Sequence, residues 1–191
     1  MVAVVSDAGP LIHLFQIGKL SLLKRIFGVV FVIEKVKVEV FDEGLRLGCI
    51  DARAVGEALT NGWLRVEPIS ENLAESAGKL AQGENISGAD AETLLLAVEK
   101  KGELLVDEKL LSNLAKMYRL KVWSTWTLLL ESLSQDYIKL HELESVVDEL
   151  GKSKFGLNSK QTKELLDEPN LLKSTKVRNK KKMDFCEILL R

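Results

Sequence analysis

The sequence predicts an α/β protein, a three-layer α/β/α sandwich around a mainly parallel five-stranded sheet, with a helical C-terminal extension. Two observations predict this class. Short runs rich in β-branched residues alternate with helical stretches of about 10–15 residues, which is the pattern of βαβ units. The first run, Val2 to Ser6, is almost continuously apolar, as expected of a strand buried on both faces of a parallel sheet.

Five strands are expected where apolar and β-branched residues form short runs between turn residues. They are residues 2–6, 29–33, 63–66, 104–106 and 122–124. Helices are expected between them, with Gly, Pro or Ser marking many of their ends. They are residues 11–17, 20–27, 34–41, 51–59, 70–82, 88–100 and 108–118. From Thr127 to about Glu168 the chain is predicted to be helical, so we expect one domain over 1–168 and a basic tail over 169–191.

The composition is that of a globular chain without a membrane segment. The 191 residues include 27 Lys and Arg, 28 Asp and Glu, and 46% hydrophobic residues, which excludes a disordered polyelectrolyte. No apolar run approaches the roughly 18 residues of a membrane span. Cys49 and Cys186 share no ligand spacing, so a disulfide scaffold is excluded and a cytoplasmic location is expected.

Acidic residues are placed around one expected edge of the sheet. Asp7 and the pair Asp107-Glu108 follow predicted strands, Asp90 and Glu92 lie in the first turn of the helix before the fourth strand, and Glu39 lies within the helix after the second strand. Each has an ordinary structural explanation, as a helix cap, a partner of the helix dipole or a solvated side chain. The carboxyl ends of parallel strands meet at one edge, however, and clustered carboxylates need a cation. Hard oxygen ligands favour Mg²⁺ or Mn²⁺.

This arrangement makes a geometric prediction. The carboxylates of Asp7, Glu39 and Asp90 should converge, and like-charge repulsion should raise the pKa of at least one of them in the absence of an ion. Zinc is disfavoured because His13 and His141 do not form a ligand-spaced pair. His13 lies in an apolar helical stretch and is expected to be a packed or interfacial residue. Phosphate-binding Gly-rich loops and a Gly-x-Ser-x-Gly elbow are absent from the sequence.

Three segments carry a resemblance to a known family. Val-Val-Ser-Asp-Ala-Gly-Pro-Leu-Ile (4–12), Gly-Ala-Asp-Ala-Glu-Thr-Leu (88–94) and Leu-Leu-Val-Asp-Glu (104–108) resemble PIN-domain proteins. These are metal-dependent nucleases that include the VapC ribonuclease toxins, and the similarity spans roughly residues 2–168. The resemblance implies an Mg²⁺- or Mn²⁺-dependent endoribonuclease that hydrolyses single-stranded or looped RNA. It also implies a homodimer, and a toxin with an antitoxin partner is one form of this activity.

The resemblance also assigns residues to roles. The catalytic acids would be Asp7, Glu39, Asp90 and Asp107. The metal ligands would be Asp7, Asp90 and either Asp107 or Glu108, and the supporting residues would be Ser6, Glu92, Ser124 and Thr125. Two departures keep a second hypothesis open: Gly9 stands where many members have Ser or Thr, and Asp107-Glu108 stands where a Thr-x-Asp pattern is frequent. That hypothesis is a catalytically inactive PIN-fold module that binds RNA or a protein.

The basic tail is the expected contact for RNA. Residues 169–191 hold seven Lys and Arg against two acids, so the rest of the chain carries a net charge of −6. Phosphate contacts are expected from Lys176, Arg178, Lys180, Lys181 and Lys182. The alternative is that residues 185–190 dock on a neighbouring subunit and that the lysines only solvate the connection.

Overall fold

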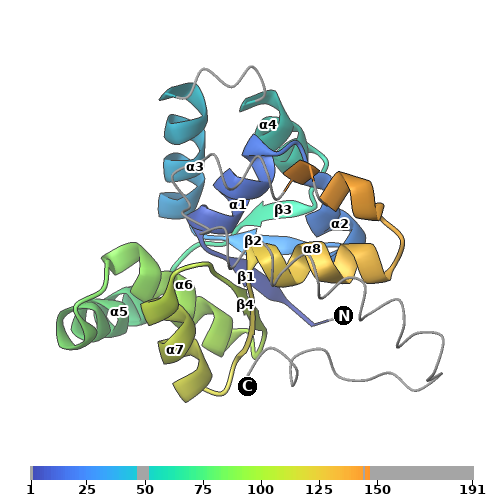
Figure 1. Cartoon of the computed structure of the whole chain (residues 1–191). Coiled ribbons are helices and arrows are strands. Elements are labelled where there is room, and N and C mark those ends of the chain that lie inside the picture. The colour runs from blue at the N-terminus through green and yellow to red at the C-terminus, as the bar shows by residue number, and fades with distance from the viewer. Residues whose placement is uncertain (1, 47–51, 144, 147–191) are drawn as a thin grey trace. The chain divides into compact units, whose positions relative to one another are not determined.

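A parallel sheet of five strands forms the middle of the protein. The computed structural model describes residues 2–46, 52–143 and 145–146 (Figure 1). The strands are β1 (Val4–Ser6), β2 (Val30–Val32), β3 (Leu64–Val66), β4 (Glu103–Leu105) and β5 (Lys121–Trp123). Their order is β3-β2-β1-β4-β5, and all four neighbouring pairs are parallel. The predicted parallel five-stranded sheet is confirmed.

Eight helices in the described residues between Ala8 and Ser134 connect and follow the strands. They are α1 (Ala8–Gln16), α2 (Ser21–Phe27), α3 (Glu34–Arg46), α4 (Ala52–Thr60), α5 (Glu71–Glu84), α6 (Gly88–Glu99), α7 (Lys109–Met117) and α8 (Thr125–Ser134). Helices α1, α3 and α4 lie on one face of the sheet, and α5, α6 and α7 lie on the other (Figure 1). The three-layer prediction is therefore also confirmed.

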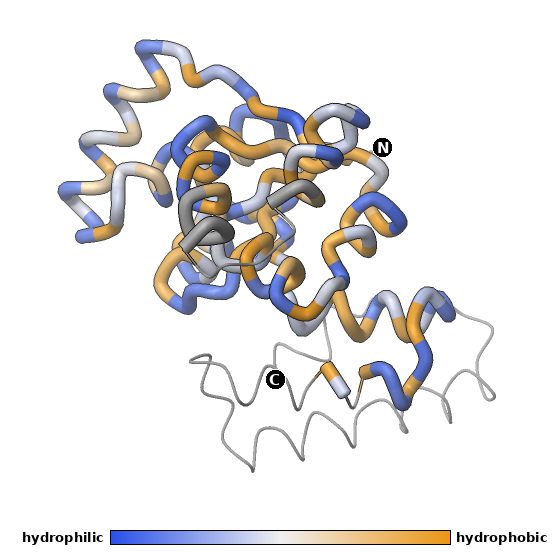
Figure 2. The backbone as a smooth tube through the Cα atoms, turned by 90° about the horizontal axis from the view of Figure 1, so that it is seen from above, coloured by the Kyte–Doolittle hydropathy of each residue, from blue (hydrophilic) through white to orange (hydrophobic). Residues whose placement is uncertain are grey.

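The core lies on both faces of the central strands. Val5 in β1 pairs with Phe31 on one side and with Leu104 on the other, and Val5 and Leu104 have no exposed surface. Figure 2 shows hydrophobic and hydrophilic residues alternating along the helices, as expected of helices that pack one face against the sheet. Gly102 is required where the chain enters β4, because a Cβ there would lie 2.4 Å from the carbonyl oxygen of Ala3.

The strand order reverses between β1 and β4. The chain proceeds from β1 to β2 and β3 on one side, and β4 and β5 are added on the other. Such a switch point opens a crevice at the carboxyl ends of the two strands. The N–H of Asp7 still donates to the carbonyl oxygen of Leu105, at 2.9 Å, so the two chains separate only after these residues.

Three helices differ from their predicted bounds by more than two residues at one end. Helix α1 begins at Ala8 rather than Leu11, directly after Asp7. Helix α3 continues five residues past Phe41, because the single Gly44 lowers helix propensity by only about 1 kcal/mol and no proline follows. Helix α8 begins at Thr125, and the helical run expected to Glu168 is interrupted after Ser134 by a turn in which Asp136 has a φ of 59°.

The chain divides into two compact units, residues 1–132 and residues 133–191. The candidate site described below lies in the first unit. In the second, residues 140–143 are helical again, whereas the predicted helix over 147–168 and the basic tail lie outside the described residues. No helix in the part of the chain that the structure describes is long and apolar enough to cross a membrane.

Candidate active site

Asp7 stands at the exit of β1, at the switch point. It occupies the N-cap position of α1 with extended backbone angles, but its side chain makes no capping hydrogen bond. The hydroxyl of the fully buried Ser6 donates to the carbonyl oxygen of Asp7 at 2.9 Å, and so supports the backbone rather than the carboxylate. A Cβ on Gly9 would lie 3.7 Å from Oδ2 of Asp7, so the chain leaves room beside this carboxylate.

The surroundings of Asp7 disfavour its charged form. The pKa of Asp7 is raised from 3.8 to about 6, mainly by burial and to a smaller extent by the negative charges of Asp90 and Glu39, against the backbone N–H groups of Ala8 and Gly9, which lower it. The predicted rise of an acid pKa is confirmed. Its main cause is different from the one expected, since burial contributes more than like-charge repulsion.

The two acids that act on Asp7 come from opposite faces of the sheet. Asp90 lies in the first turn of α6, where its carboxylate accepts from the N–H of Ser87 at 3.2 Å while its own N–H donates to the Ser87 hydroxyl at 3.0 Å. This capping box begins the helix and fixes Asp90 near the sheet edge. Glu39 is an exposed residue of α3.

Glu92 has a cationic partner. Its Oε1 lies 2.7 Å from Nζ of Lys35, and the Glu92 side chain is 12% exposed whereas the Lys35 side chain is 57% exposed. The pair joins α3 to α6 close to the α6 N-terminus, because a Cβ on Gly88 would lie 3.9 Å from the same Nζ. The structure thus places Glu92 in an ion pair beside the other acids.

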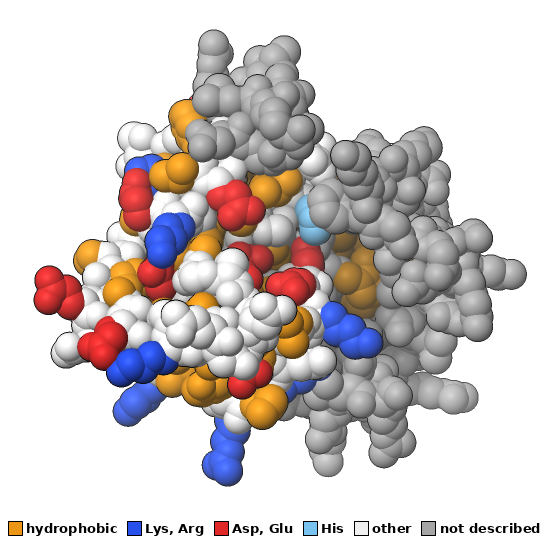
Figure 3. Space-filling model, turned by 90° about the vertical axis from the view of Figure 1, so that its left-hand side faces the viewer, with side chains coloured by type: hydrophobic (Ala, Val, Ile, Leu, Met, Phe, Trp, Pro, Cys, Tyr) orange, Lys and Arg blue, Asp and Glu red, His pale blue; other side chains and the backbone are white. Residues whose placement is uncertain are grey.

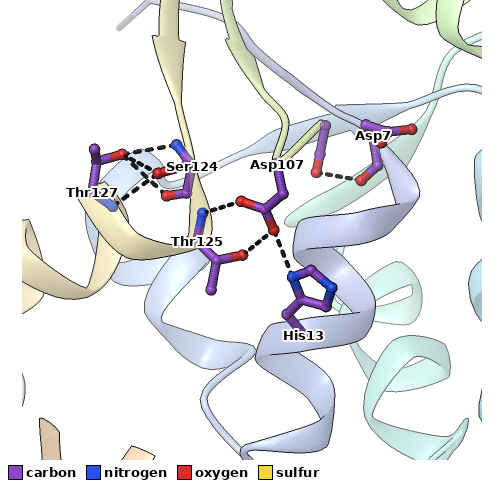
Figure 4. A network of polar contacts seen from close by, with 7 residues as sticks. Asp7, His13, Asp107, Ser124, Thr125 and Thr127 are labelled. Atoms are coloured by element: carbon purple, nitrogen blue, oxygen red, sulfur yellow. Dashed lines mark hydrogen bonds and ion pairs between the residues drawn. The ribbon is translucent and has the colours of Figure 1, made fainter. Parts of the chain in front are cut away.

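Asp107 is held by a network of three hydrogen bonds (Figure 4). The backbone N–H of Thr125 donates to Oδ1 at 2.7 Å, and the Thr125 hydroxyl donates to Oδ2 at 2.6 Å. Nδ1 of His13 lies 2.6 Å from Oδ2. The Asp107 carboxylate is therefore fixed between the start of α8 and the last turn of α1, with 22% of its side chain exposed.

The segment that carries Thr125 is itself capped. Ser124 Oγ accepts from the N–H of Thr127 at 3.1 Å, and Thr127 Oγ1 accepts from the N–H of Ser124 at 2.8 Å. This reciprocal pair has the geometry of a capping box at the start of α8. It aims the N–H and the hydroxyl of Thr125 at Asp107, as Figure 4 shows.

Glu108 differs from its neighbour Asp107. It is exposed at the N-cap position of α7, and its side chain makes no capping hydrogen bond. Of the two adjacent acids, Asp107 is the one bound into the network at the end of β4.

Three polar contributors were not identified from the sequence: His13, Lys35 and Thr127. His13 is expected to be packed or interfacial, and it is indeed 7% exposed, but it bonds a carboxylate 94 residues away. The usable signal was its place among buried apolar residues of α1, because a buried imidazole needs a polar partner. Lys35 and Thr127 carry no such signal, since exposed lysines and helix-start threonines are common.

A divalent cation fits the chemistry and the charge of this edge. The carboxylates offer hard oxygen donors, and a cation would stabilise the charged form of Asp7, which burial and, to a smaller extent, the charges of Asp90 and Glu39 disfavour. Figure 3 shows acidic side chains around a hollow on one face of the molecule. As they stand, no three His, Cys, Asp or Glu side chains within the described ranges are grouped tightly enough to hold one ion. Asp90 and Asp107 are each engaged in separate hydrogen bonds.

Comparison with known proteins agrees with the fold. No curated protein matches the sequence. A family model described as a PIN domain matches residues 3–170, which covers most of the chain and includes every acid discussed above. The chain therefore belongs to the PIN-domain family.

Proposed function

We propose that the protein is an Mg²⁺- or Mn²⁺-dependent endoribonuclease. PIN domains are generally nucleases and generally use divalent metal ions, so the family supports the reaction class. The observation that carries the proposal is the partly buried carboxyl of Asp7 at the switch point, on which the charges of Asp90 and Glu39 act. A helix cap alone does not explain Asp7, because burial and the charges of Asp90 and Glu39 raise its pKa although the N–H groups of Ala8 and Gly9 favour the charged form.

The ligands in this proposal are Asp7, Asp90 and Asp107, with Glu39 as a further acid. When bound, the ion would activate water and stabilise the charge that develops on a phosphate in an in-line displacement. Asp7 contributes a carboxylate at the rigid end of a buried strand, and Asp107 contributes one whose orientation is fixed by Thr125. Asp90 would release its bond to the N–H of Ser87 in order to turn towards Asp7.

RNA is the proposed substrate, in single-stranded or looped form. The acidic edge of the sheet must reach a single phosphate of the RNA backbone. Single-stranded and looped RNA expose such a phosphate, whereas the backbone of a base-paired helix is less accessible. Lys35 supplies an exposed cation beside these acids, since its Nζ is held by Glu92 close to the α6 N-terminus. We propose that Lys35 contacts a phosphate next to the cleaved bond.

The decisive experiment is cleavage by the purified chain. A fluorescent single-stranded RNA should be cut with Mn²⁺ or Mg²⁺ and left intact with EDTA, and a hairpin should be cut only in its loop. Cleavage that persists in EDTA would reject the metal-dependent mechanism. Comparing Asp107→Asn with Glu108→Gln shows which of the two residues is the fourth acid of the site. We expect Asp107→Asn to lose activity and Glu108→Gln to keep most of it.

A second candidate function is RNA or protein binding without cleavage. It is favoured by the separate engagement of the carboxylates and by Gly9, which offers no hydroxyl to support Asp7. RNA binding that is unaffected by EDTA, with no product over long incubation at high enzyme concentration, would decide for it.

Several finer hypotheses belong to the same proposal and stay predictions. They are a homodimer, an antitoxin partner, a cytoplasmic location, a domain over 1–168 and phosphate contacts by the tail lysines and arginine. The tail residues, Lys176, Arg178, Lys180, Lys181 and Lys182, lie outside the described residues. Size-exclusion chromatography with light scattering tests the dimer directly.

A further inference from the structure

We propose that His13 is a positioning residue, which holds the Asp107 carboxylate in the orientation that the metal site requires. The inference rests on the proposed function, because it takes Asp107 as a metal ligand. His13 itself is not a ligand in this proposal. Its role is to donate a hydrogen bond from Nδ1 to Oδ2 of Asp107.

The contact has the features of a part-buried hydrogen bond between an imidazole and a carboxylate. The two atoms lie 2.6 Å apart, and the side chains of His13 and Asp107 are 9% and 22% exposed. An ionised carboxylate only accepts hydrogen bonds, so the proposal takes the tautomer of His13 that carries a proton on Nδ1. A buried imidazole without such a partner would leave a polar atom unsatisfied.

His13 restricts the rotation of the Asp107 side chain that Thr125 alone would allow. Thr125 binds both carboxylate oxygens, but it does so from a single direction, the start of α8. His13 reaches Oδ2 from α1, on another side of the carboxylate (Figure 4). Donors from two elements fix the rotation of the Asp107 side chain, whereas one element would allow it to swing with α8.

The helix that carries His13 also carries Asp7 at its N-cap position. The same nine-residue helix therefore begins at one candidate ligand and binds the other. A displacement of α1 relative to the end of β4 would break the bond of His13. In this way His13 couples the spacing of the Asp7 and Asp107 carboxylates to the packing of α1.

Three substitutions separate positioning from simple core packing. His13→Asn keeps an amide N–H near the place of Nδ1, His13→Gln moves the amide to the place of the other ring nitrogen, and His13→Leu removes the donor. Asn and Gln are both polar and neutral, so they form a matched pair that stays informative even if the Leu variant does not fold. The full chain is used throughout.

The first measurement needs no metal. In the metal-free protein, NMR follows the side-chain carboxyl carbon of Asp107 and the amide proton of Thr125. We expect both signals to stay close to the wild type in His13→Asn and to move in His13→Gln and His13→Leu. Signals that remain in place in all three variants, or that move equally in Asn and Gln, would overturn the proposal.

The second measurement is Mn²⁺ binding, followed by EPR of the free ion. Outer-shell partners of metal ligands change affinity by about 10–100-fold, so we expect a loss of that size in His13→Gln and much less in His13→Asn. Equal affinities in the wild type and in His13→Gln would contradict the proposal. If the wild type binds no Mn²⁺, the proposed function fails, and the NMR measurement alone then decides whether His13 positions Asp107.

Discussion

Two acids follow adjacent strands of this sheet, and their surroundings are opposite. Asp7, after β1, is partly buried beside the charges of Asp90 and Glu39, and its pKa rises to about 6. Asp107, after β4, receives three hydrogen bonds from His13 and Thr125. The charged form of Asp7 is thus destabilised, whereas the Asp107 carboxylate receives hydrogen bonds from nearby donors.

The difference separates two requirements of a metal site. Uncompensated negative charge favours the binding of a cation, whereas hydrogen bonds from fixed donors orient a ligand. In this chain the first requirement is met on the β1 side and the second on the β4 side. If this division of roles is correct, substitutions on the two sides should differ in sign for stability although both reduce activity.

The largest effect is expected for cleavage by Asp7→Asn. The amide keeps the size of the side chain but removes the charge that a divalent cation needs, so the Mn²⁺-dependent rate should fall at least ~10³-fold, about 4 kcal/mol in the barrier. Single-turnover cleavage of a fluorescent RNA measures this loss. The matched control is Glu99→Gln, an exposed acid at the other end of α6. A wild-type rate in Asp7→Asn would mean that this residue only begins α1.

The same substitution should stabilise the metal-free protein. Asp7 has a folded pKa of about 6 against 3.8 in the unfolded chain, so its ionisation costs up to about 3 kcal/mol of folding free energy above pH 6. The cost vanishes below pH 4, where the carboxyl is protonated in both states. Urea unfolding of Asp7→Asn with EDTA should therefore show a gain at pH 8 that disappears near pH 3.5. A gain that is equal at both pH values would contradict this origin.

On the other side of the comparison, Asp107→Asn should destabilise the protein. An amide can accept the bonds of Thr125 and His13 only in part, and charge-assisted hydrogen bonds are worth about 1.5–3 kcal/mol each. We expect a loss of about 2 kcal/mol at pH 8, measured by urea unfolding with EDTA. Glu108→Gln at the exposed neighbour should stay within about 0.5 kcal/mol of the wild type. A stabilised Asp107→Asn would show that the two acids share one environment.

The Asp7 side was easier to predict from sequence than the Asp107 side. A buried apolar run that ends in an acid predicts both a strand and a carboxylate at its exit, and β1 with Asp7 has this form. The acidic first turn of α6 likewise predicts a carboxylate, that of Asp90, at the start of this helix. These relations are local, so residue order is sufficient to predict them.

The Asp107 side depends on contacts between distant segments. His13 and Asp107 meet only because β1 and β4 are neighbours, and sequence alone does not order the strands of a sheet. Which of Asp107 and Glu108 turns inwards depends on where β4 ends and α7 begins, within a residue or two. Element boundaries are the part of a prediction that sequence patterns fix least well. The bounds of α1, α3 and α8 show the same limit.

The smallest predicted effect tests whether the two sides are independent. Ser124→Ala removes the hydroxyl that accepts from the N–H of Thr127, so α8 should lose a cap worth about 1 kcal/mol. Thr125 then binds Asp107 less firmly, and its amide proton should exchange faster with solvent. The control is Ser76→Ala on α5, whose hydroxyl donates to the carbonyl oxygen of Asn72 within the same helix.

Because Asp7 does not contact this cap, its titration near pH 6, followed by the carboxyl carbon signal, should be unchanged in Ser124→Ala. A shifted titration of Asp7 would show that the β4 side controls the charge of the β1 side. Asp7 and Asp107 would then belong to one coupled site. In that site, loosening α8 would let Asp107 approach Asp7, and its negative charge would raise the pKa of Asp7 further. An unchanged titration together with faster Thr125 exchange would establish that the donors around Asp107 act on orientation alone.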